Sequence, residues 1–414
     1  MISNGDSIER IDGKNYIPAI ILERIMEDRD RCIRRIELAT ETKRKLMQAK
    51  TLEESEAICI PDEFKLFGEF DKCVMDSYVS GFTLATDEGS PRCHYGSMGA
   101  IASIVTPELY RGEIRDYGLT SGLSSLGRSI RFNGMNQSLE SKLLSFFIEQ
   151  VRKVIFMGFL TCFRQFHEFP FGEPLDGLIA QHYGLKTQFI DLTDDIKVAL
   201  FFACCRHEGN NLYRPINEGD ISEIGKEGII YRGYSDRARI IGFQPFCRCH
   251  RQRGYYIDTA VAEPCWEFIL SKDTGFEKYY FDRTVELSER LYEEFDGGKT
   301  LFPDDGLEPF AEVIAQMQIE KAFPSEAFDI AYKVFCLYLE TYRANRTISN
   351  EIISIMRNKD YLISKLQSGG FVLCSQLKLK ASQRVIGEMN IDWDPVEFAQ
   401  KEGFFYSPFI ISDK

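Results

Sequence analysis

Short apolar runs separated by glycine and polar clusters fill the middle third of the chain, and this pattern constrains the fold more than any other feature. Such runs have the length and punctuation of strands bounded by turns. Two helices are predicted among them, one from Ser138 as N-cap to about Arg164 and one that starts near Asp194. The mixture predicts an α+β fold with a mixed sheet at its core. The strand candidates are residues 101–105, 189–192, 228–231 and 255–257.

Apolar residues at helical spacing mark both flanks of this sheet region. From Tyr16 to about Lys50 isoleucines recur with charges between them, which predicts an amphipathic helix for packing or oligomerisation. After about Val285 the pattern is again helical, with glycine and proline breaks. The helix candidates there are residues 285–295, 308–320, 325–342 and 347–366. We therefore predict an N-terminal helical region, an α+β domain and a mostly helical C-terminal region, at residues 1–84, 85–284 and 285–414.

Length and composition indicate a soluble protein of more than one unit. At 414 residues the chain exceeds one ordinary core, and roughly 150 residues per domain suggests two or three units. No apolar run approaches the ~20 residues that span a bilayer. The segment from Met1 to Gly13 lacks the pattern of a secretion signal, so we expect a cytoplasmic protein without a membrane partner. The twelve cysteines are scattered and are expected to be free thiols.

Charge and missing motifs exclude several classes of function. The net charge of −13 disfavours broad nucleic-acid binding, which needs cations to neutralise phosphates. Five arginines between Arg237 and Arg253 form either a local basic patch or a solvated face. The cluster at Cys247, Cys249 and His250 has no second ligand pair at zinc spacing, so no metal site is predicted. Motifs of P-loop enzymes, zinc proteases and α/β-hydrolases are also missing from the sequence.

An arginine and a histidine are the first candidate site residues. Arg111 stands before a glycine on a predicted strand, where its planar fork suits a phosphate or carboxylate and the glycine lets a ligand approach. The alternative for Arg111 is a structural ion pair with Glu113 or Asp191. His182 lies between Gln181 and Tyr183 and either contacts a ligand or is a hydrogen-bonded core residue.

Three further candidates follow later in the sequence. Asp191 joins a strand to a helix and is predicted to orient His182 or Arg111. Thr193 or the following Asp194 is predicted to cap that helix, whose free amides could also receive an anion. Gln252, on a predicted strand beside a glycine, either hydrogen-bonds a sugar or faces water at a sheet edge. We predict that Arg111, His182, Asp191, Thr193 and Gln252 converge on one pocket.

Three sequence elements resemble the FRG domain family in order and spacing over about residues 85–270. The family's Phe-Arg-Gly element is represented with tyrosine in place of phenylalanine. The central element lacks the proline, arginine and tryptophan of the usual PTRLLDWT. The closing R-x-x-x-Q-x-G-x-F pattern again has tyrosine for phenylalanine. The elements are Leu109-Tyr110-Arg111-Gly112, the run 180–193 (AQHYGLKTQFIDLT) with 198–203 (VALFFA), and residues 248–256.

The resemblance implies a site similar to that of ADP-ribosyltransferase-like domains, with NAD as substrate. In that case Arg111 clamps the pyrophosphate, Thr193 with the helix start supports the nicotinamide ribose, and Gln252 contacts the ribose hydroxyls. His182 positions the ligand or assists proton transfer, so His182 and Gln252 are the catalytic candidates and Arg111, Asp191 and Thr193 the cofactor-binding ones. No metal is implied.

The same resemblance leaves more than one function open. The third element lacks an obvious catalytic glutamate, and nothing in the sequence places Glu263 or Glu267 in a cleft. A non-catalytic module that binds a nucleotide or a protein partner is therefore the alternative to an NAD-consuming enzyme. FRG-like domains among bacterial accessory proteins also suggest a toxin or phage-defence factor. The expected partners are a nucleotide-like small molecule and, through the helical regions, a protein or a second copy of the chain.

Overall fold

The computed structural model describes the chain in several separate ranges. No helix within these ranges is both long and apolar enough to cross a membrane. The strand candidate 101–105, most of the helix candidate 308–320, and both Glu263 and Glu267 lie outside them. The described residues are 8–58, 108–122, 138–161, 166, 176–209, 212–235, 238–241, 244, 246, 248–259, 275–303, 314, 321–344 and 348–375.

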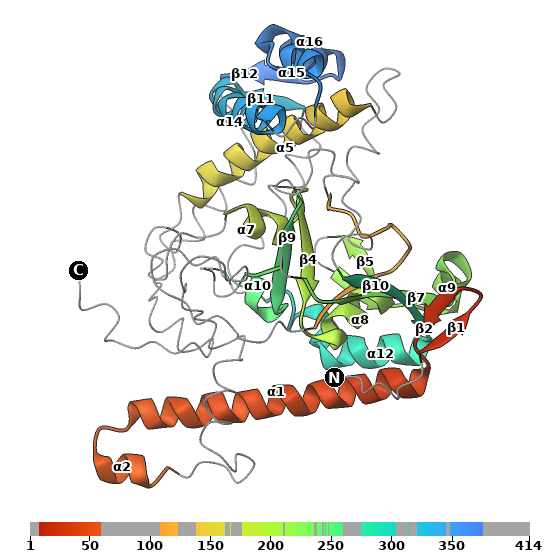
Figure 1. Ribbon diagram of the computed structural model, residues 1–414. Helices are drawn as coiled ribbons and strands as arrows, with labels where there is room; N and C mark the ends of the chain where they lie inside the picture. Colours follow the sequence, from red (N-terminus) through yellow and green to blue (C-terminus); the bar gives the residue numbers. More distant parts are fainter. Residues whose placement is uncertain are drawn as a thin grey trace.

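A mixed sheet forms the centre of the molecule, and the predicted α+β fold is confirmed (Figure 1). Its strand order is β1-β2-β10-β7-β3-β4-β9-β8. Only the pair β10 and β2 is parallel among the described strands of this sheet, and the other neighbours are antiparallel. The strands are β1 (Glu9–Ile11), β2 (Lys14–Tyr16), β3 (Leu109–Glu113), β4 (Phe189–Thr193), β7 (Glu227–Gly233), β8 (Arg239–Ile240), β9 (Gly254–Asp258) and β10 (Phe276–Asp282).

Helices from distant parts of the sequence pack together on one face of the sheet. The short apolar helix α8 (Ile196–Cys204) lies directly on β3 and β7. Helices α12 (Val285–Glu294) and α1 (Ala19–Gln48) add their apolar stripes to the same core, so α1 is a packing helix as predicted. In Figure 1, α1 runs along the bottom of the molecule next to α12. A short helix, α2 (Leu52–Glu56), follows α1.

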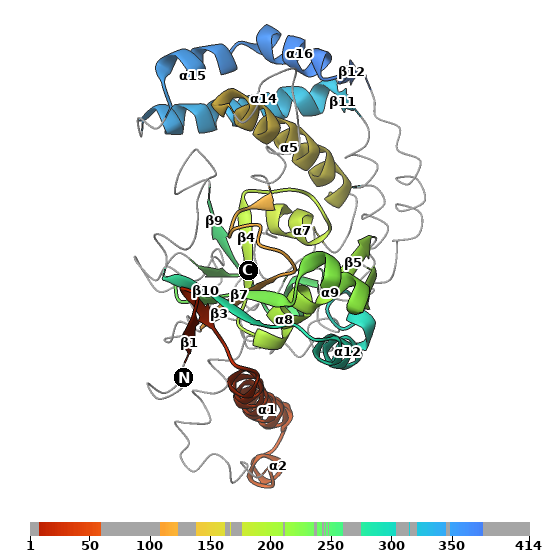
Figure 2. The ribbon, with the colours of Figure 1, turned by 90° about the vertical axis from the view of Figure 1, so that its right-hand side faces the viewer.

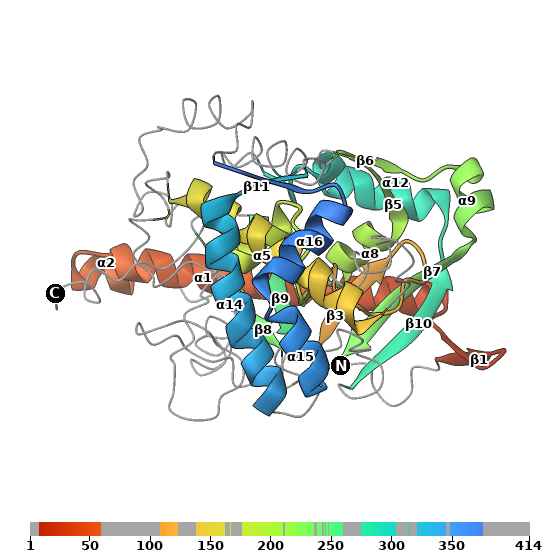
Figure 3. The ribbon, with the colours of Figure 1, turned by 90° about the horizontal axis from the view of Figure 1, so that it is seen from above.

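The C-terminal helices form a second layer with α5 (Leu139–Leu160), away from the sheet (Figure 2). Figure 3 shows this layer from above. Ser138 caps α5 by accepting a hydrogen bond from the Ser141 amide, as predicted. Aromatic side chains of α5 interlock with those of α14, and a two-stranded parallel sheet closes the layer. The elements are α14 (Ser325–Ala344), α15 (Asn350–Met356), α16 (Lys359–Ser368), β11 (Ala322–Pro324) and β12 (Val372–Cys374).

The packing groups two segments differently from their order in the sequence. Helix α12 begins at the predicted boundary near residue 285, yet its Leu287 and Leu291 lie in the core of the sheet region. Helix α5 precedes that boundary but packs with α14. The division at residues 84 and 284 stays a prediction. Limited proteolysis near residue 285 would test it, because these contacts hold α12 and α5 in cores on the other side of the boundary.

Some elements differ from the sequence-based expectation. The predicted helix 347–366 is divided into α15 and α16 because Asn358 accepts a hydrogen bond from the Tyr361 amide and starts a new helix. The short strands β1 and β2, strand β10 and the hairpin of β5 (Cys205–Gly209) with β6 (Leu212–Pro215) were not predicted. Three of the seven residues of β10 are charged (FEKYYFD), so its signal was weaker than that of the buried strands.

Candidate functional site

The candidate site lies where two neighbouring strands of the sheet separate. Strands β3 and β4 share a single register pair, Tyr110 with Thr193. Beyond that pair no ladder joins Arg111 to β4, and its Nη1 atom instead donates to the carbonyl oxygen of Asp191 at 3.0 Å. A sheet that parts in this way leaves backbone and side chains accessible from the gap, and a cavity occupies it.

All five predicted site residues line this one cavity, which has a volume of about 420 Å³. They come from β3, β4, the C-terminal end of α7 (Asp176–His182) and the turn that follows α10 (Arg248–Arg251). The predicted convergence is therefore observed, and the separate roles of the five stay predictions. Those five are Arg111, His182, Asp191, Thr193 and Gln252, and they share the wall with Tyr110, Gly112, Glu113, Ile114, Tyr117, Gln181, Gly184, Leu192, Val198, Ala199, Phe202, His207, Tyr213, Gly254 and Phe302.

Arg111 pairs with an acid inside the cavity, as the structural alternative predicted. Its Nε atom donates to Glu113 Oε1 at 3.2 Å, and the Glu113 side chain is buried. Burial raises the pKa of Glu113, and the neighbouring Arg111 charge opposes that rise. The Arg111 side chain is 26% exposed, and among the described residues none accepts a hydrogen bond from its Nη2 group. Arg111 thus has a fixed orientation and still has donors for an anion.

The amide of Gln252 determines which nitrogen of His182 carries hydrogen. Gln252 Nε2 donates to the carbonyl oxygen of Leu301 at 3.1 Å, so its Oε1 atom must be the one that faces His182 Nδ1, also at 3.1 Å. A carboxamide oxygen can only accept, and Nδ1 is therefore the donor. The neutral ring then presents an unprotonated Nε2 atom. Gln252 lies in a turn before β9, and its predicted placement on a strand is wrong.

The Nε2 atom of His182 faces a carboxylate oxygen, and neither has a hydrogen-bond partner among the described residues. The distance from Nε2 to Asp191 Oδ1 is 3.8 Å, and both atoms are buried. Burial lowers the pKa of His182, although Asp191 acts to raise it, so the ring is held neutral. Two buried acceptors that face one another without a donor cost free energy unless a third group supplies hydrogens. This pair is the feature of the cavity that most clearly indicates a ligand.

Thr193 holds the adjoining turn in place. Its hydroxyl donates to the Gln252 carbonyl oxygen at 2.9 Å and accepts from the Asp195 amide at 3.1 Å. Asp195 is the N-cap of α8, with its side chain accepting from the Lys197 amide, so the predicted cap at Thr193 or Asp194 is wrong. The hydroxyl of Thr193 reaches Gln252 because Thr193 pairs with Gly254, two residues further on, where β4 meets β9.

Asp194 is a buried acid that ties the site to the N-terminal helix. Arg253 donates to both of its oxygens, at 2.6 and 2.9 Å, and Arg29 of α1 approaches at 3.0 Å. Burial alone would raise the pKa of Asp194, but these two arginines outweigh it and lower that pKa below 3.8. Arg253 has a φ of +49°, a left-handed conformation that the bidentate pair stabilises next to Gln252.

An aromatic wall completes the cavity, and the sequence did not predict it. Tyr213 of β6 stacks on Phe302 with ring centroids 5.1 Å apart and planes at 19°. Phe202 of α8 meets both rings edge-on, and His207 of β5 lies 4.9 Å from Tyr213. Phe202 belongs to the apolar run 198–203, and nothing near Phe302 in the sequence signals a site. Such flat apolar surfaces suit a planar ring of a ligand.

Gly112 is required by the protein backbone. A Cβ atom at this position would lie 1.7 Å from the carbonyl oxygen of Ala199 in α8. The sequence suggested that this glycine lets a ligand approach the backbone. The structure shows that it lets helix α8 pack closely against β3. The close approach of α8 to β3 brings Val198 and Phe202 to the cavity wall.

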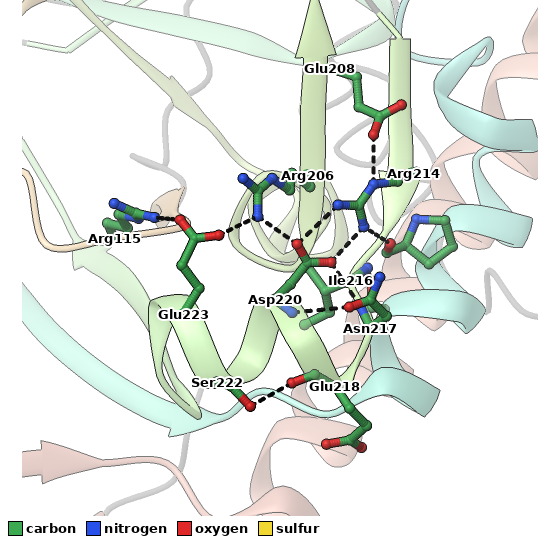
Figure 4. A network of polar contacts seen from close by, with 12 residues as sticks. Arg115, Arg206, Glu208, Arg214, Ile216, Asn217, Glu218, Asp220, Ser222 and Glu223 are labelled. Atoms are coloured by element: carbon green, nitrogen blue, oxygen red, sulfur yellow. Dashed lines mark hydrogen bonds and ion pairs between the residues drawn. The ribbon is translucent and has the colours of Figure 1, made fainter.

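Ion pairs fasten the hairpin that carries Tyr213 (Figure 4). Asp220 at the start of α9 (Glu218–Ile224) lies between Arg206 and Arg214 of the hairpin, and the first of these also contacts Glu223. Asp220 is held at the start of α9 by a capping box, in which the Asn217 side chain accepts from the Asp220 amide and the Asp220 side chain accepts from the Asn217 amide. The network fixes one side of the aromatic wall.

Two buried cysteines, Cys204 and Cys205, follow the cavity residue Phe202 in the sequence. Among the described residues no cluster of histidine, cysteine and carboxylate side chains could hold a metal ion. Cys204 and Cys205 are free and buried, and burial raises the pKa of Cys205 to about 12. Both thiols therefore stay protonated at neutral pH.

Residues 106–211 match the family model described as the FRG domain. The chain therefore contains an FRG domain, as the sequence elements predicted. The matched residues include Arg111, His182, Asp191 and Thr193, whereas Gln252 lies beyond them in the part of the fold that completes the cavity. Comparison with curated proteins and with solved structures gave no match.

Proposed function

We propose that this cavity binds a nucleotide-like ligand and that NAD is the substrate cleaved there, by hydrolysis or by transfer of ADP-ribose. The observation that carries the proposal is the combination of two kinds of wall in one cavity. Arg111 offers donors for a diphosphate, and His182 with Asp191 offers acceptors. Tyr213 and Phe302 offer aromatic faces for a planar ring. A dinucleotide has groups of all three kinds.

The size and location of the cavity agree with this proposal. Its volume of about 420 Å³ lies within the range of roughly 300–1,000 Å³ that is typical of small-molecule sites. The FRG domain supplies four of the five polar residues. Thr193 and Gln252 act in this scheme by orienting His182, because their polar groups are already hydrogen-bonded within the protein.

A binding module without turnover is the second candidate. It is favoured by Arg111, whose charge is already paired with Glu113, and by the lack of a glutamate beside Gln252 in the third sequence element. Such a module would use the same cavity to hold a nucleotide. It would leave the ligand unchanged.

Calorimetry with NAD and chromatography of free nicotinamide separate the two candidates. The enzyme proposal predicts binding at or below millimolar NAD together with nicotinamide release. Binding without release supports the non-catalytic module. If the protein does not bind NAD at millimolar concentration, NAD is the ligand of neither candidate, and both proposals fail for NAD. If release is seen, expression in growing cells should lower their NAD content, as a toxin or phage-defence role requires.

A further inference from the structure

The unpaired acceptors at His182 and Asp191 restrict the group that can lie between them. They are 3.8 Å apart, so one oxygen or nitrogen atom at a hydrogen-bond distance of about 2.8 Å can reach both. To satisfy both acceptors that atom must carry two hydrogens. A water molecule or a primary amino or amide group meets this requirement, whereas an alcohol has only one hydrogen to donate.

The protein side of this arrangement is held rigidly. Gln252 accepts from His182 Nδ1 and donates to Leu301, and Thr193 binds the Gln252 carbonyl. His182 is 3% exposed, so its ring has little freedom to turn. The Asp191 side chain is 40% exposed and both residues line the cavity, whereas Asp191 Oδ1 and His182 Nε2 are buried, so only a small group at the cavity wall can bridge them.

We propose that a water molecule held between His182 Nε2 and Asp191 Oδ1 is the nucleophile, and that the reaction is hydrolysis of NAD to ADP-ribose and nicotinamide. This inference rests on the proposed function of NAD cleavage. It selects hydrolysis over transfer to a macromolecule. Both hydrogens of the water point to the two acceptors, so its lone pairs are directed at the bound ligand.

The step balances with these groups alone. The water oxygen forms a bond to C1′ of the nicotinamide ribose while the bond from C1′ to the pyridinium nitrogen breaks. The electron pair of that bond neutralises the ring, which leaves as nicotinamide. One proton of the water passes to His182 Nε2, the imidazolium is stabilised by Asp191, and the proton then goes to solvent. No oxidant, reductant or metal is needed.

The test uses the full chain with NAD in water and in molar methanol, with nicotinamide, ADP-ribose and methyl ADP-ribose measured by chromatography and mass spectrometry. We expect one free ADP-ribose for each nicotinamide. We also expect methyl ADP-ribose to fall below the mole fraction of methanol, because an alcohol cannot satisfy both acceptors. Methyl product at or above that fraction, or ADP-ribose found attached to protein, overturns the inference and leaves NAD cleavage intact.

Variants separate a catalytic role of His182 from a structural one. His182→Asn keeps a donor toward Gln252 but lacks the base, so release should fall about 10²- to 10⁴-fold while NAD affinity is retained. Added imidazole should restore part of the activity of His182→Ala. If the His182 variants bind NAD tenfold more weakly with kcat unchanged, His182 and Asp191 bind an amide group of the ligand and not a water molecule, which overturns the inference.

A matched pair of acids completes the design. Asp191→Asn should lose most of the nicotinamide release, because its neutral amide cannot stabilise the imidazolium that forms on His182. Asp329→Asn, in an exposed ion pair with Lys359, should release nicotinamide at the parent rate. Equal activity of Asp191→Asn and the parent overturns the inference. Absence of NAD binding by the parent in calorimetry refutes the proposed function itself, an outcome distinct from all of these.

Discussion

The C-terminal helices α14, α15 and α16 bury different kinds of atoms from the sheet region around the cavity. Helix α5, which packs on these helices, differs from them because it buries an ion pair of Glu149 and Arg152. In residues 321–344 and 348–375 every buried residue is apolar. Around the cavity Glu113, Thr193, Asp194 and Gln252 are buried, and unpaired acceptors remain on His182 and Asp191. Apolar burial stabilises without directional demands, whereas buried polar atoms cost free energy unless they are paired. Buried polar atoms are therefore a larger cost to the stability of the fold around the cavity than in these three helices.

The largest expected effect tests how tightly the sheet region is built. Gly112→Ala places a Cβ atom 1.7 Å from the Ala199 carbonyl oxygen, which forces α8 away from β3. We expect a loss of more than about 4 kcal/mol in unfolding free energy, a size reserved for severe core changes. Urea unfolding measures it. Gly158→Ala in α5 meets nothing within 4 Å and should be neutral or stabilising, and a similar loss in both variants would contradict this account.

A cavity in the helical layer should destabilise the protein without changing the site. Phe335 is fully buried and contacts Phe147, with ring centroids 5.2 Å apart. Phe335→Ala should cost about 3–5 kcal/mol of unfolding free energy and leave NAD affinity of the folded protein unchanged. Thermal unfolding and calorimetry measure the two quantities. Leu337→Ala on the exposed face is the control, and weakened binding by Phe335→Ala alone would show that the two regions are coupled.

Removing the buried charge at Asp194 should destabilise the sheet region and the site together. Asp194→Asn leaves Arg253 and Arg29 without their acid, at a cost of about 3 kcal/mol or more. Because the folded-state pKa of Asp194 is lowered, its stabilisation is present above pH 3.8 and is lost as pH falls through the folded value. Acid unfolding of parent and variant measures this. Asp116→Asn, in an exposed pair with Lys278, should cost at most about 1 kcal/mol.

Arg111→Lys should weaken NAD binding while the fold is retained. Lysine keeps the charge but loses the planar fork, and a charge-assisted hydrogen bond contributes about 1.5–3 kcal/mol, or roughly ten- to more than a hundredfold in affinity. Calorimetry on variants with matching melting curves tests this. If the variant binds NAD as tightly as the parent, Arg111 does not contact the ligand, and its role is the ion pair with Glu113.

The smallest effect is the pH dependence contributed by His182. Its folded-state pKa lies below 6.5, so the unfolded chain binds the proton more readily. Stability is therefore present above pH 6.5 and is lost as pH falls toward the lowered value, by up to about 1.4 kcal/mol per pH unit. Urea unfolding between pH 7 and 5 should show a shallower dependence for His182→Asn, within roughly that limit. Identical slopes would mean that His182 is not held neutral by burial.

Much of the polar half of the site could be predicted because it lies within local sequence motifs. Arg111, His182, Asp191 and Thr193 stand beside strand or helix signals, and the resemblance to the FRG domain family groups them into one site. Ser138 was predicted as a cap from its local context alone. These assignments depend on residues close together in sequence.

The aromatic half could not be predicted because it is assembled by tertiary contacts. Tyr213 reaches the cavity only because the hairpin folds over α8, and Phe302 follows a turn with no strand or helix signal. The engagement of Thr193 with the Gln252 carbonyl joins residues 59 positions apart. The sequence alone does not encode such pairings in any local pattern.

Hydrogen exchange with and without millimolar NAD tests the central claim most directly, because it reports on both regions in one experiment. We predict slower exchange in peptides that cover residues 109–113, 189–193 and 248–254 when NAD is present. Peptides from 325–368 should exchange at the same rate in both conditions. No protection around the cavity, or protection confined to the helical layer, would contradict the assignment of this cavity as the NAD site.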